Sequence, residues 1–206
     1  MLTDAAPKGS NRASFLESDL LRNLDLPPGG NLTTIASFIE STMEDGTTAS
    51  VRRTCAHFLA ELAGFYEVPA CGVRVLAARP LRVLESSTIE LFGDYRADTR
   101  LIRVWMRTAV RREVTSFGTF LSTLCHEFCH HLDFYKYGFP NSWHTRGFYA
   151  RAGALYHCAR GTTPKRLFWV PGGTRALADQ LASDKSWRMT LLGWNTTSAE
   201  CAGMSG

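Results

Sequence analysis

Apolar positions along the first third of the chain recur with the period of helices. In residues 31–43, and again in residues 48–65, they are spaced by three and four positions, which is typical of helices buried on one face. Asn31 is a suitable N-cap for the first of these helices. The Asp-Gly pair at 45–46 separates the two.

The next stretch alternates as strands do. Residues 73–85 contain Pro80 and predict two short strands or one edge strand, and residues 89–96 predict another strand. In residues 101–107 the even-numbered positions are apolar, and the odd-numbered positions include Arg103 and Arg107. We interpret this segment as a half-exposed edge strand whose arginine side faces solvent or a ligand.

The clearest periodicity lies in the helix that follows. Ser116 can cap it, and Gly138 and Pro140 end it. One buried stripe runs along it, made of Phe117, Phe120, Leu121, Leu124, Phe128 and Leu132. A further helix is predicted from near His144 to about Ala159. Helices, a small mixed sheet and two more helices indicate an α+β fold.

Composition divides the chain into three parts. Residues 1–30 are rich in Ser, Asn, Asp, Pro and Gly, and we expect a flexible N-terminal arm with one short helix near residues 15–24. Residues 31–170 form the predicted domain. Residues 171–206 carry only weak patterns and are expected to be a weakly structured C-terminal tail.

Overall composition is that of an ordinary globular protein. The chain has 206 residues, of which 45% are hydrophobic and 20% charged, which excludes a wholly disordered, collagen-like or coiled-coil chain. The net charge of +4 permits nucleic-acid binding without arguing for it. We find no secretory signal and no apolar run long enough to span a membrane, so we expect a cytoplasmic protein with no membrane association. The six cysteines form no C-x-x-C pair and are expected to be free thiols.

Candidate chemistry lies on the strongest helix, where residues 126–130 read H-E-x-x-H. His126 and His130 project from one face, one turn apart, so their ring nitrogens can converge on one Zn²⁺ at about 2.0–2.1 Å. Glu127 lies beside them and can take a proton from a zinc-bound water. The alternative is a pair of surface histidines on an amphipathic helix. Because the opposite face is apolar, we expect the motif to line a cleft instead.

A catalytic zinc needs a third protein ligand and an open position. His144 is best placed, since it follows the reversal at residues 138–140 and begins the next helix. His131 is rotated about 100° from His130 along the helix and cannot easily share its metal. Asp133 is one turn from His130 and is a candidate to contact a ligand. The only glutamate downstream is Glu200, in the weakest part of the chain.

These residues carry a resemblance to a known family. Leu124 to His131, followed after about a dozen positions by residues 143–149 (WHTRGFY), resemble the SprT-like (Spartan-type) zinc metallopeptidase domain over roughly residues 48–160. The positions that match the family's ligands, its glutamate and its following aromatic residue are His126, Glu127, His130, His144 and Phe148. The resemblance implies a zincin-like fold and zinc-dependent peptide hydrolysis. Thr145 departs from the family's common glycine, and a C-terminal zinc ribbon is absent.

We therefore predict a zinc metalloendopeptidase that acts on a protein or peptide, with zinc on His126, His130 and His144 and with Glu127 as general base. Strand 101–107 is expected to align the substrate by strand addition. The first alternative is a non-proteolytic zinc-binding or regulatory module that contacts DNA through the arginine strand. The second is a structural helix without metal.

The sequence does not identify the group that stabilises the oxyanion. Tyr156, His157 and Arg146 on the last predicted helix are candidates for this role, but a packing or surface role is favoured for each.

Overall fold

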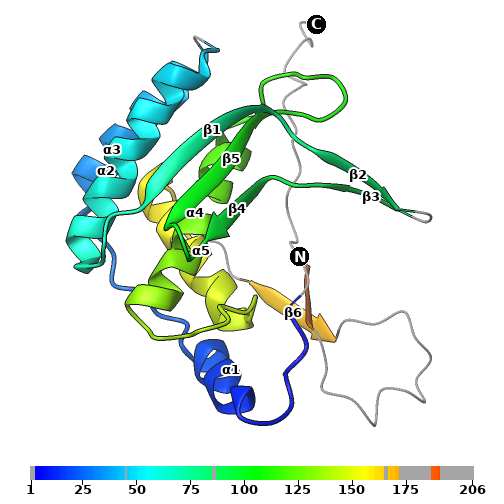
Figure 1. Cartoon of the computed structure of the whole chain (residues 1–206). Helices are drawn as coiled ribbons and strands as arrows, with labels where there is room; N and C mark the ends of the chain where they lie inside the picture. The colour runs from blue at the N-terminus through cyan, green and yellow to red at the C-terminus, as the bar shows by residue number, and fades with distance from the viewer. Residues whose placement is uncertain (1–2, 45, 85–86, 165–166, 172–186, 191–206) are drawn as a thin grey trace, which may run out of the picture.

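The protein is a mixed α+β structure, seen in a computed structural model that describes residues 3–44, 46–84, 87–164, 167–171 and 187–190 (Figure 1). Within these residues the helices are α1 (Asn11–Leu20), α2 (Gly29–Glu44), α3 (Thr48–Tyr66), α4 (Phe117–Tyr135) and α5 (Arg146–Arg160). The main sheet holds β1 (Gly72–Ala78), β4 (Gly93–Arg96) and β5 (Leu101–Arg107). Two hairpins are formed by β2 (Leu81–Leu84) with β3 (Ser87–Glu90) and by β6 (Phe168–Pro171) with β7 (Trp187–Thr190). The α+β class predicted from the sequence is confirmed.

The strand order of the main sheet is β1-β5-β4. β5 pairs in parallel with β1 and antiparallel with β4, so both of its edges are occupied. The prediction that residues 101–107 form an edge strand is therefore wrong. The alternation of side chains reports which face of a strand is buried, and it carries no information about which strands lie on either side. The single strand predicted over residues 89–96 is divided, because β3 belongs to the hairpin and β4 to the sheet.

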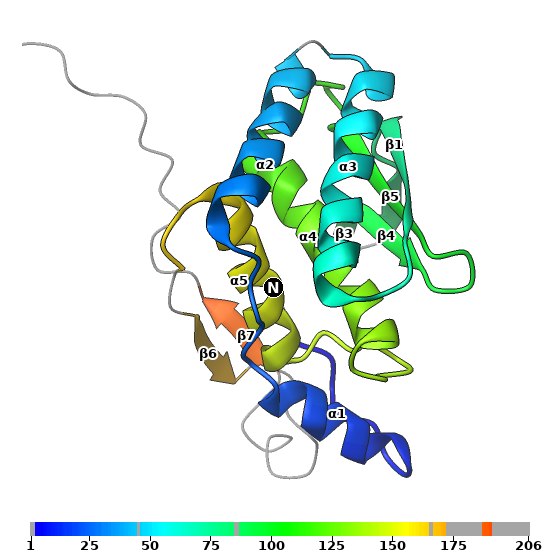
Figure 2. The same ribbon diagram turned by 90° about the vertical axis from the view of Figure 1, so that its left-hand side faces the viewer.

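One face of this sheet is buried under helices. The inward side chains of β5 are Ile102, Val104 and Met106, all fully buried, and the register places Val73 and Val75 of β1 beside the first two. α3 packs against β1, and α4 packs against β4 and β5. Figure 2 shows α2 beside α3 and β1 next to α3, with α4 behind the two helices.

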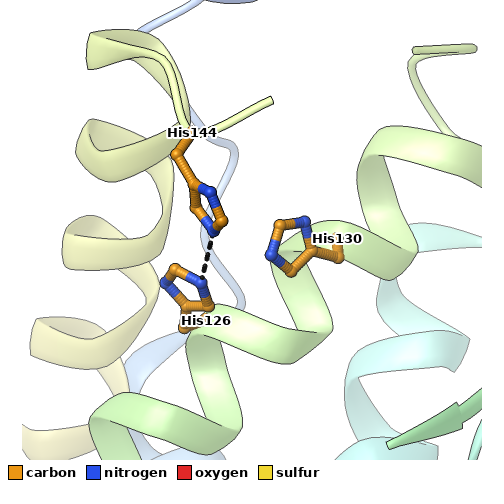
Figure 3. A group of neighbouring side chains, drawn as sticks. All are labelled: His126, His130 and His144. Carbon is orange, nitrogen blue, oxygen red and sulfur yellow. Dashed lines mark hydrogen bonds between the residues drawn. The ribbon is translucent and has the colours of Figure 1, made fainter. Parts of the chain in front are cut away.

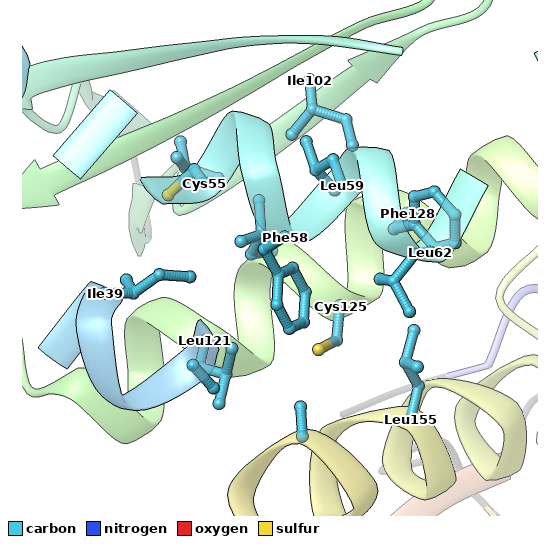
Figure 4. Close-up of a cluster of buried hydrophobic side chains, with 14 of the residues drawn as sticks. Ile39, Cys55, Phe58, Leu59, Leu62, Ile102, Leu121, Cys125, Phe128 and Leu155 are labelled. Carbon is cyan, nitrogen blue, oxygen red and sulfur yellow. The ribbon is translucent and has the colours of Figure 1, made fainter. Parts of the chain in front are cut away.

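The core joins the helices to the sheet (Figure 4). α3 contributes Phe58, Leu59 and Leu62, each with no exposed surface. They meet Phe128 of α4 and Leu155 of α5 in one cluster. Each such side chain contributes about 1.5–3 kcal/mol by its removal from water. Burial on this scale fixes α4 and α5 relative to each other.

Both α4 and α5 begin with a side-chain N-cap, and the cap of α4 is the one predicted from the sequence. The Ser116 hydroxyl accepts a hydrogen bond from the Thr119 amide at the start of α4. Thr145 accepts one from the Phe148 amide at the start of α5. The reversal between the helices includes Gly138, whose φ of 68° is readily adopted only by glycine.

The N-terminal segment, expected to be a flexible arm with one short helix near residues 15–24, contains a helix that packs against the domain. Residues 11–20 form α1, which packs against α5. Phe15 is buried and its ring centroid lies 5.7 Å from that of Trp143, while Ser18 and Asp19 are buried polar residues. The polar composition of this segment suggested solvent exposure, but its polar side chains are partners of residues in α5.

The C-terminal tail predicted over residues 171–206 falls largely outside the described residues, which include only Pro171 and β7 from it. Within the described residues, none of the helices has both the length and the apolar character needed to cross a bilayer. Five of the six cysteines are in the described part of the chain, and these five are free thiols, as predicted.

Candidate metal centre

The three predicted ligands come together at one point (Figure 3). His126 and His130 lie one turn apart on α4, and His144 lies just before α5, with the three rings directed toward one another. One ring nitrogen from each lies within 4.8 Å of the other two. The Nε2 atoms of His126 and His144 are 3.0 Å apart. Two nitrogen ligands of a tetrahedral zinc ion lie about 3.3 Å apart, so the spacing suits a metal of that size.

Burial keeps the α4 imidazoles neutral. It lowers the pKa of His126 to about 3, with a further contribution from the nearby His144. Burial also lowers the pKa of His130, and the two neighbouring histidines add to this effect. A neutral imidazole presents the lone pair that a metal ion requires, and a protonated one does not.

A hydrogen-bond relay selects the tautomer of His130. The Ser142 hydroxyl donates to Oδ2 of Asp133 at 3.0 Å, which uses its only proton. It therefore accepts from Nδ1 of His130, 2.7 Å away. With its proton on Nδ1, His130 presents the Nε2 lone pair to the centre. Asp133, which the sequence suggested as a neighbour of a ligand, acts on His130 through Ser142.

Asp133 is itself held by a buried cation. Its carboxylate forms an ion pair of 2.7 Å with Arg151, and the exposed fractions of the two side chains are 0% and 1%. Arg151 also donates to the backbone carbonyls of Ser18 and Leu21 at the end of α1. Through Asp133 and Arg151, the hydrogen-bond relay from His130 therefore connects α4, α5 and the end of α1.

Glu127 lies on α4 beneath strand β4, with an exposed fraction of 6%. Burial, and to a lesser degree the Asp94 carboxylate, raise its pKa to about 8. A Cβ atom on Gly93 would lie 2.9 Å from Oε1 of Glu127 and 2.6 Å from Cγ2 of Thr123. The backbone of β4 approaches Glu127 this closely because residue 93 has no side chain.

His131 is excluded from the centre, as the sequence predicted. Its Nδ1 lies 2.8 Å from the hydroxyl of Tyr95, and its Nε2 lies 2.8 Å from the backbone carbonyl oxygen of Pro69. Both ring nitrogens are occupied by structural hydrogen bonds on the far side of α4.

The aromatic hydroxyl beside the centre is Tyr149, which the sequence did not single out. Its ring centroid lies 5.8 Å from that of His144 and 6.1 Å from that of His126. Burial raises its pKa to about 12, so the phenol is protonated at neutral pH and can donate a hydrogen bond. Its place five residues after His144 is the one sequence feature that distinguishes it.

The other oxyanion candidates are engaged elsewhere. Nδ1 of His157 lies 2.8 Å from the Thr162 hydroxyl, at the opposite end of α5 from His144. Tyr156 precedes it at the same end of the helix, with its hydroxyl beside Gly118. Arg146 forms an ion pair with Asp19 of α1.

The two arginines on β5 are used within the fold. Arg103 donates from Nε to Asp94 at 2.7 Å and forms an ion pair with the same carboxylate. Arg107 donates to the backbone carbonyls of Arg112 and Gly46. Hydrogen bonds within the protein thus account for both side chains.

Comparison with known proteins found no matching family model, no matching curated protein and no matching solved structure.

Proposed function

We propose that this protein is a zinc-dependent metallopeptidase with a zincin-like fold, of the kind the SprT-like resemblance implies. The single observation that carries the proposal is the convergence of His126, His130 and His144, the first of which is followed directly by Glu127. Three imidazole nitrogens and no thiolate are a ligand set that suits Zn²⁺ and leaves a fourth position for water. An acid directly following the first ligand on the same helix is what hydrolysis requires and metal binding alone does not.

The reaction assigned to this site is hydrolysis of a peptide bond. A zinc ion bound by the three histidines would polarise the scissile carbonyl and lower the pKa of water. Glu127 takes the proton from the attacking water and returns it to the nitrogen of the leaving amine.

We assign the alignment of the substrate to β4 rather than to β5. In the described residues β4 pairs only with β5, so its second edge is available to an extended peptide. Gly93 on this strand lies directly against the Glu127 side chain. A peptide added along β4 would therefore pass over the catalytic carboxylate.

We assign stabilisation of the oxyanion to Tyr149. Its phenol is protonated and its ring lies beside two of the three ligands, which makes it the donor we assign to a carbonyl oxygen near the metal. The non-proteolytic, DNA-associated alternative is less well supported. It depended on Arg103 and Arg107, whose guanidinium groups bond to the protein itself.

Elemental mass spectrometry of protein purified without added metal tests the centre. About one zinc per chain is expected in the wild type, and little in the His144→Ala variant. His57→Ala is the matched control, because His57 is an exposed residue of α3 and its loss leaves the zinc content unchanged. A wild-type protein that binds no zinc even after incubation with it would overturn the proposal.

Peptidase assays with an unfolded protein substrate test the chemistry. Glu127→Gln is expected to retain zinc and lose turnover, whereas Tyr149→Phe is expected to lower kcat about 100-fold. Turnover that persists in Glu127→Gln contradicts the assigned mechanism. Stoichiometric zinc without hydrolysis in the wild type would favour the non-proteolytic alternative.

A further inference from the structure

The N-terminal segment places the carboxylate of Asp4 against His144, the third candidate ligand. Oδ2 of Asp4 accepts a hydrogen bond of 2.8 Å from the backbone nitrogen of His144. The backbone nitrogen of Asp4 donates to the carbonyl oxygen of His144 at 3.1 Å. One residue of this segment therefore holds both the amide and the carbonyl of the ligand residue.

The same carboxylate faces the imidazole. Oδ2 of Asp4 lies 3.6 Å from Nδ1 of His144, whose other nitrogen faces His126. A negative charge beside Nδ1 favours the proton on that atom and keeps the lone pair on Nε2. This is the role that Ser142 has toward His130, filled here by a carboxylate distant in the sequence.

Further contacts fix the segment to the residues that follow the ligand. The hydroxyls of Ser18 and Thr145 are 3.1 Å apart. Asp19 accepts from the backbone nitrogen of Arg146 at 2.9 Å. A Cβ atom on Gly147 would lie 2.0 Å from the carbonyl oxygen of Ser18, so only glycine permits this approach.

Residues 144, 145, 146 and 147 thus each contact the segment that contains Asp4 and α1. α4 positions its two ligands through its own regular backbone, but His144 precedes α5 and has no helix to hold it. Its position is fixed from outside, by Asp4 and by the contacts of α1 with the first turn of α5.

We infer that Asp4 is a positioning residue of the metal centre, and that the N-terminal segment completes the site by holding His144 in its ligating orientation. The inference rests on the proposed function only in requiring that the three histidines bind a metal. It predicts that a change at Asp4 weakens zinc binding although Asp4 is not itself a ligand.

The test compares the zinc affinity of four proteins by competition with a chelator: wild type, Asp4→Asn, Asp4→Ala and Glu17→Gln. Asp4→Asn removes the charge that faces Nδ1 and retains an oxygen that can accept from the His144 amide. We expect about 10-fold weaker zinc binding for Asp4→Asn and up to about 100-fold for Asp4→Ala. Glu17→Gln removes an exposed carboxylate of the same segment and is expected to bind zinc as the wild type does.

The visible spectrum of the Co²⁺-substituted proteins separates positioning from general stability. A reoriented imidazole changes the ligand field, so the d–d bands of Asp4→Asn should differ from those of the wild type, and those of Glu17→Gln should not. The conservative Asp4→Glu variant should recover part of the zinc affinity.

Wild-type affinity and an unchanged cobalt spectrum in Asp4→Asn would overturn the inference and leave the metal centre intact. An equal loss of affinity in Glu17→Gln would also overturn it, since net charge and not position would be the cause. A wild-type protein that binds no metal would overturn the proposed function first, and this inference with it.

Discussion

Arg151 and Asp133 form an ion pair of 2.7 Å that is almost completely removed from solvent and is linked through Ser142 to the candidate ligand His130. Two opposite charges in this position are costly to desolvate and stabilise the fold only as a pair. The pair joins α4 to α5, and through Arg151 it also joins the end of α1. The ion pair that holds these helices together is therefore the same one that positions His130.

Arg151→Met is predicted to destabilise the protein by about 3–5 kcal/mol, because it leaves the Asp133 carboxylate buried without its cation. Urea denaturation of the metal-free protein measures this effect. Arg96→Met is the control. Arg96 lies 3.9 Å from Asp98 with both side chains more than half exposed, and its loss should cost about 0–1 kcal/mol. Similar costs for the two variants would contradict the role given to the buried pair.

Ser142→Ala is predicted to weaken zinc binding about 10-fold, because His130 loses the acceptor that holds its proton on Nδ1. Residue 142 has a φ of 41°, and alanine matches serine there in having a Cβ, so backbone strain is the same in both. Ser116→Ala serves as the comparison, since it removes the N-cap of α4 at a cost of about 1 kcal/mol and should leave zinc affinity unchanged. Equal zinc affinity in Ser142→Ala and the wild type would rule out the relay.

The sequence predicted the parts of this site that depend on local geometry. The spacing of His126 and His130 follows from the helix period, and the predicted cap Ser116 satisfies an amide only three residues away. His144 was reached from its place after the chain reversal and from the resemblance. These features need no knowledge of what lies across the fold.

The parts that the sequence did not predict are contacts between distant segments. Asp4 meets His144 because the N-terminal segment lies against the start of α5, and Arg151 meets Asp133 because α5 packs against α4. The polar N-terminal segment was expected to be flexible because polarity along a sequence does not distinguish solvated side chains from buried, bonded ones. The strand order was not predicted for a related reason: the alternation of apolar and polar side chains along a strand does not show which strands lie beside it.

Gly93→Ala is predicted to abolish most peptidase activity while zinc remains bound. The added Cβ would lie within 3.0 Å of both Glu127 and Thr123, which forces the carboxylate or the strand to move. Overpacking of this kind costs about 1–3 kcal/mol of stability as well. A zinc-loaded Gly93→Ala protein with wild-type kcat/KM would contradict the placement of β4 over Glu127.

Gly64→Ala provides the control for this substitution. Gly64 is an exposed residue of α3, and a Cβ atom there would meet no atom within 4 Å. Alanine is preferred over glycine inside a helix by about 0.5–1 kcal/mol, so this variant should be slightly more stable than the wild type and equally active.

Asp19 gives the fold a defined dependence on pH. Burial opposes ionisation of its carboxyl, but the hydrogen bonds and charge of Arg146 outweigh burial and hold its pKa below the ordinary 3.8. The folded state therefore binds fewer protons at this site than the unfolded state does. The stabilisation is fully present above the unfolded pKa and is lost as the pH falls through the lower, folded pKa.

Asp19→Asn is accordingly predicted to cost about 2 kcal/mol at pH 7, where the charged hydrogen bonds to Arg146 are intact in the wild type. The difference between the two proteins should shrink as the pH is lowered toward the folded pKa, because the wild-type carboxyl is then protonated as well. Urea denaturation at a series of pH values from 7 downward measures this, with Glu17→Gln as a control that removes an exposed carboxylate of the same helix. A destabilisation by Asp19→Asn that stays constant across the series would show that the ion pair with Arg146 does not hold α1 against α5.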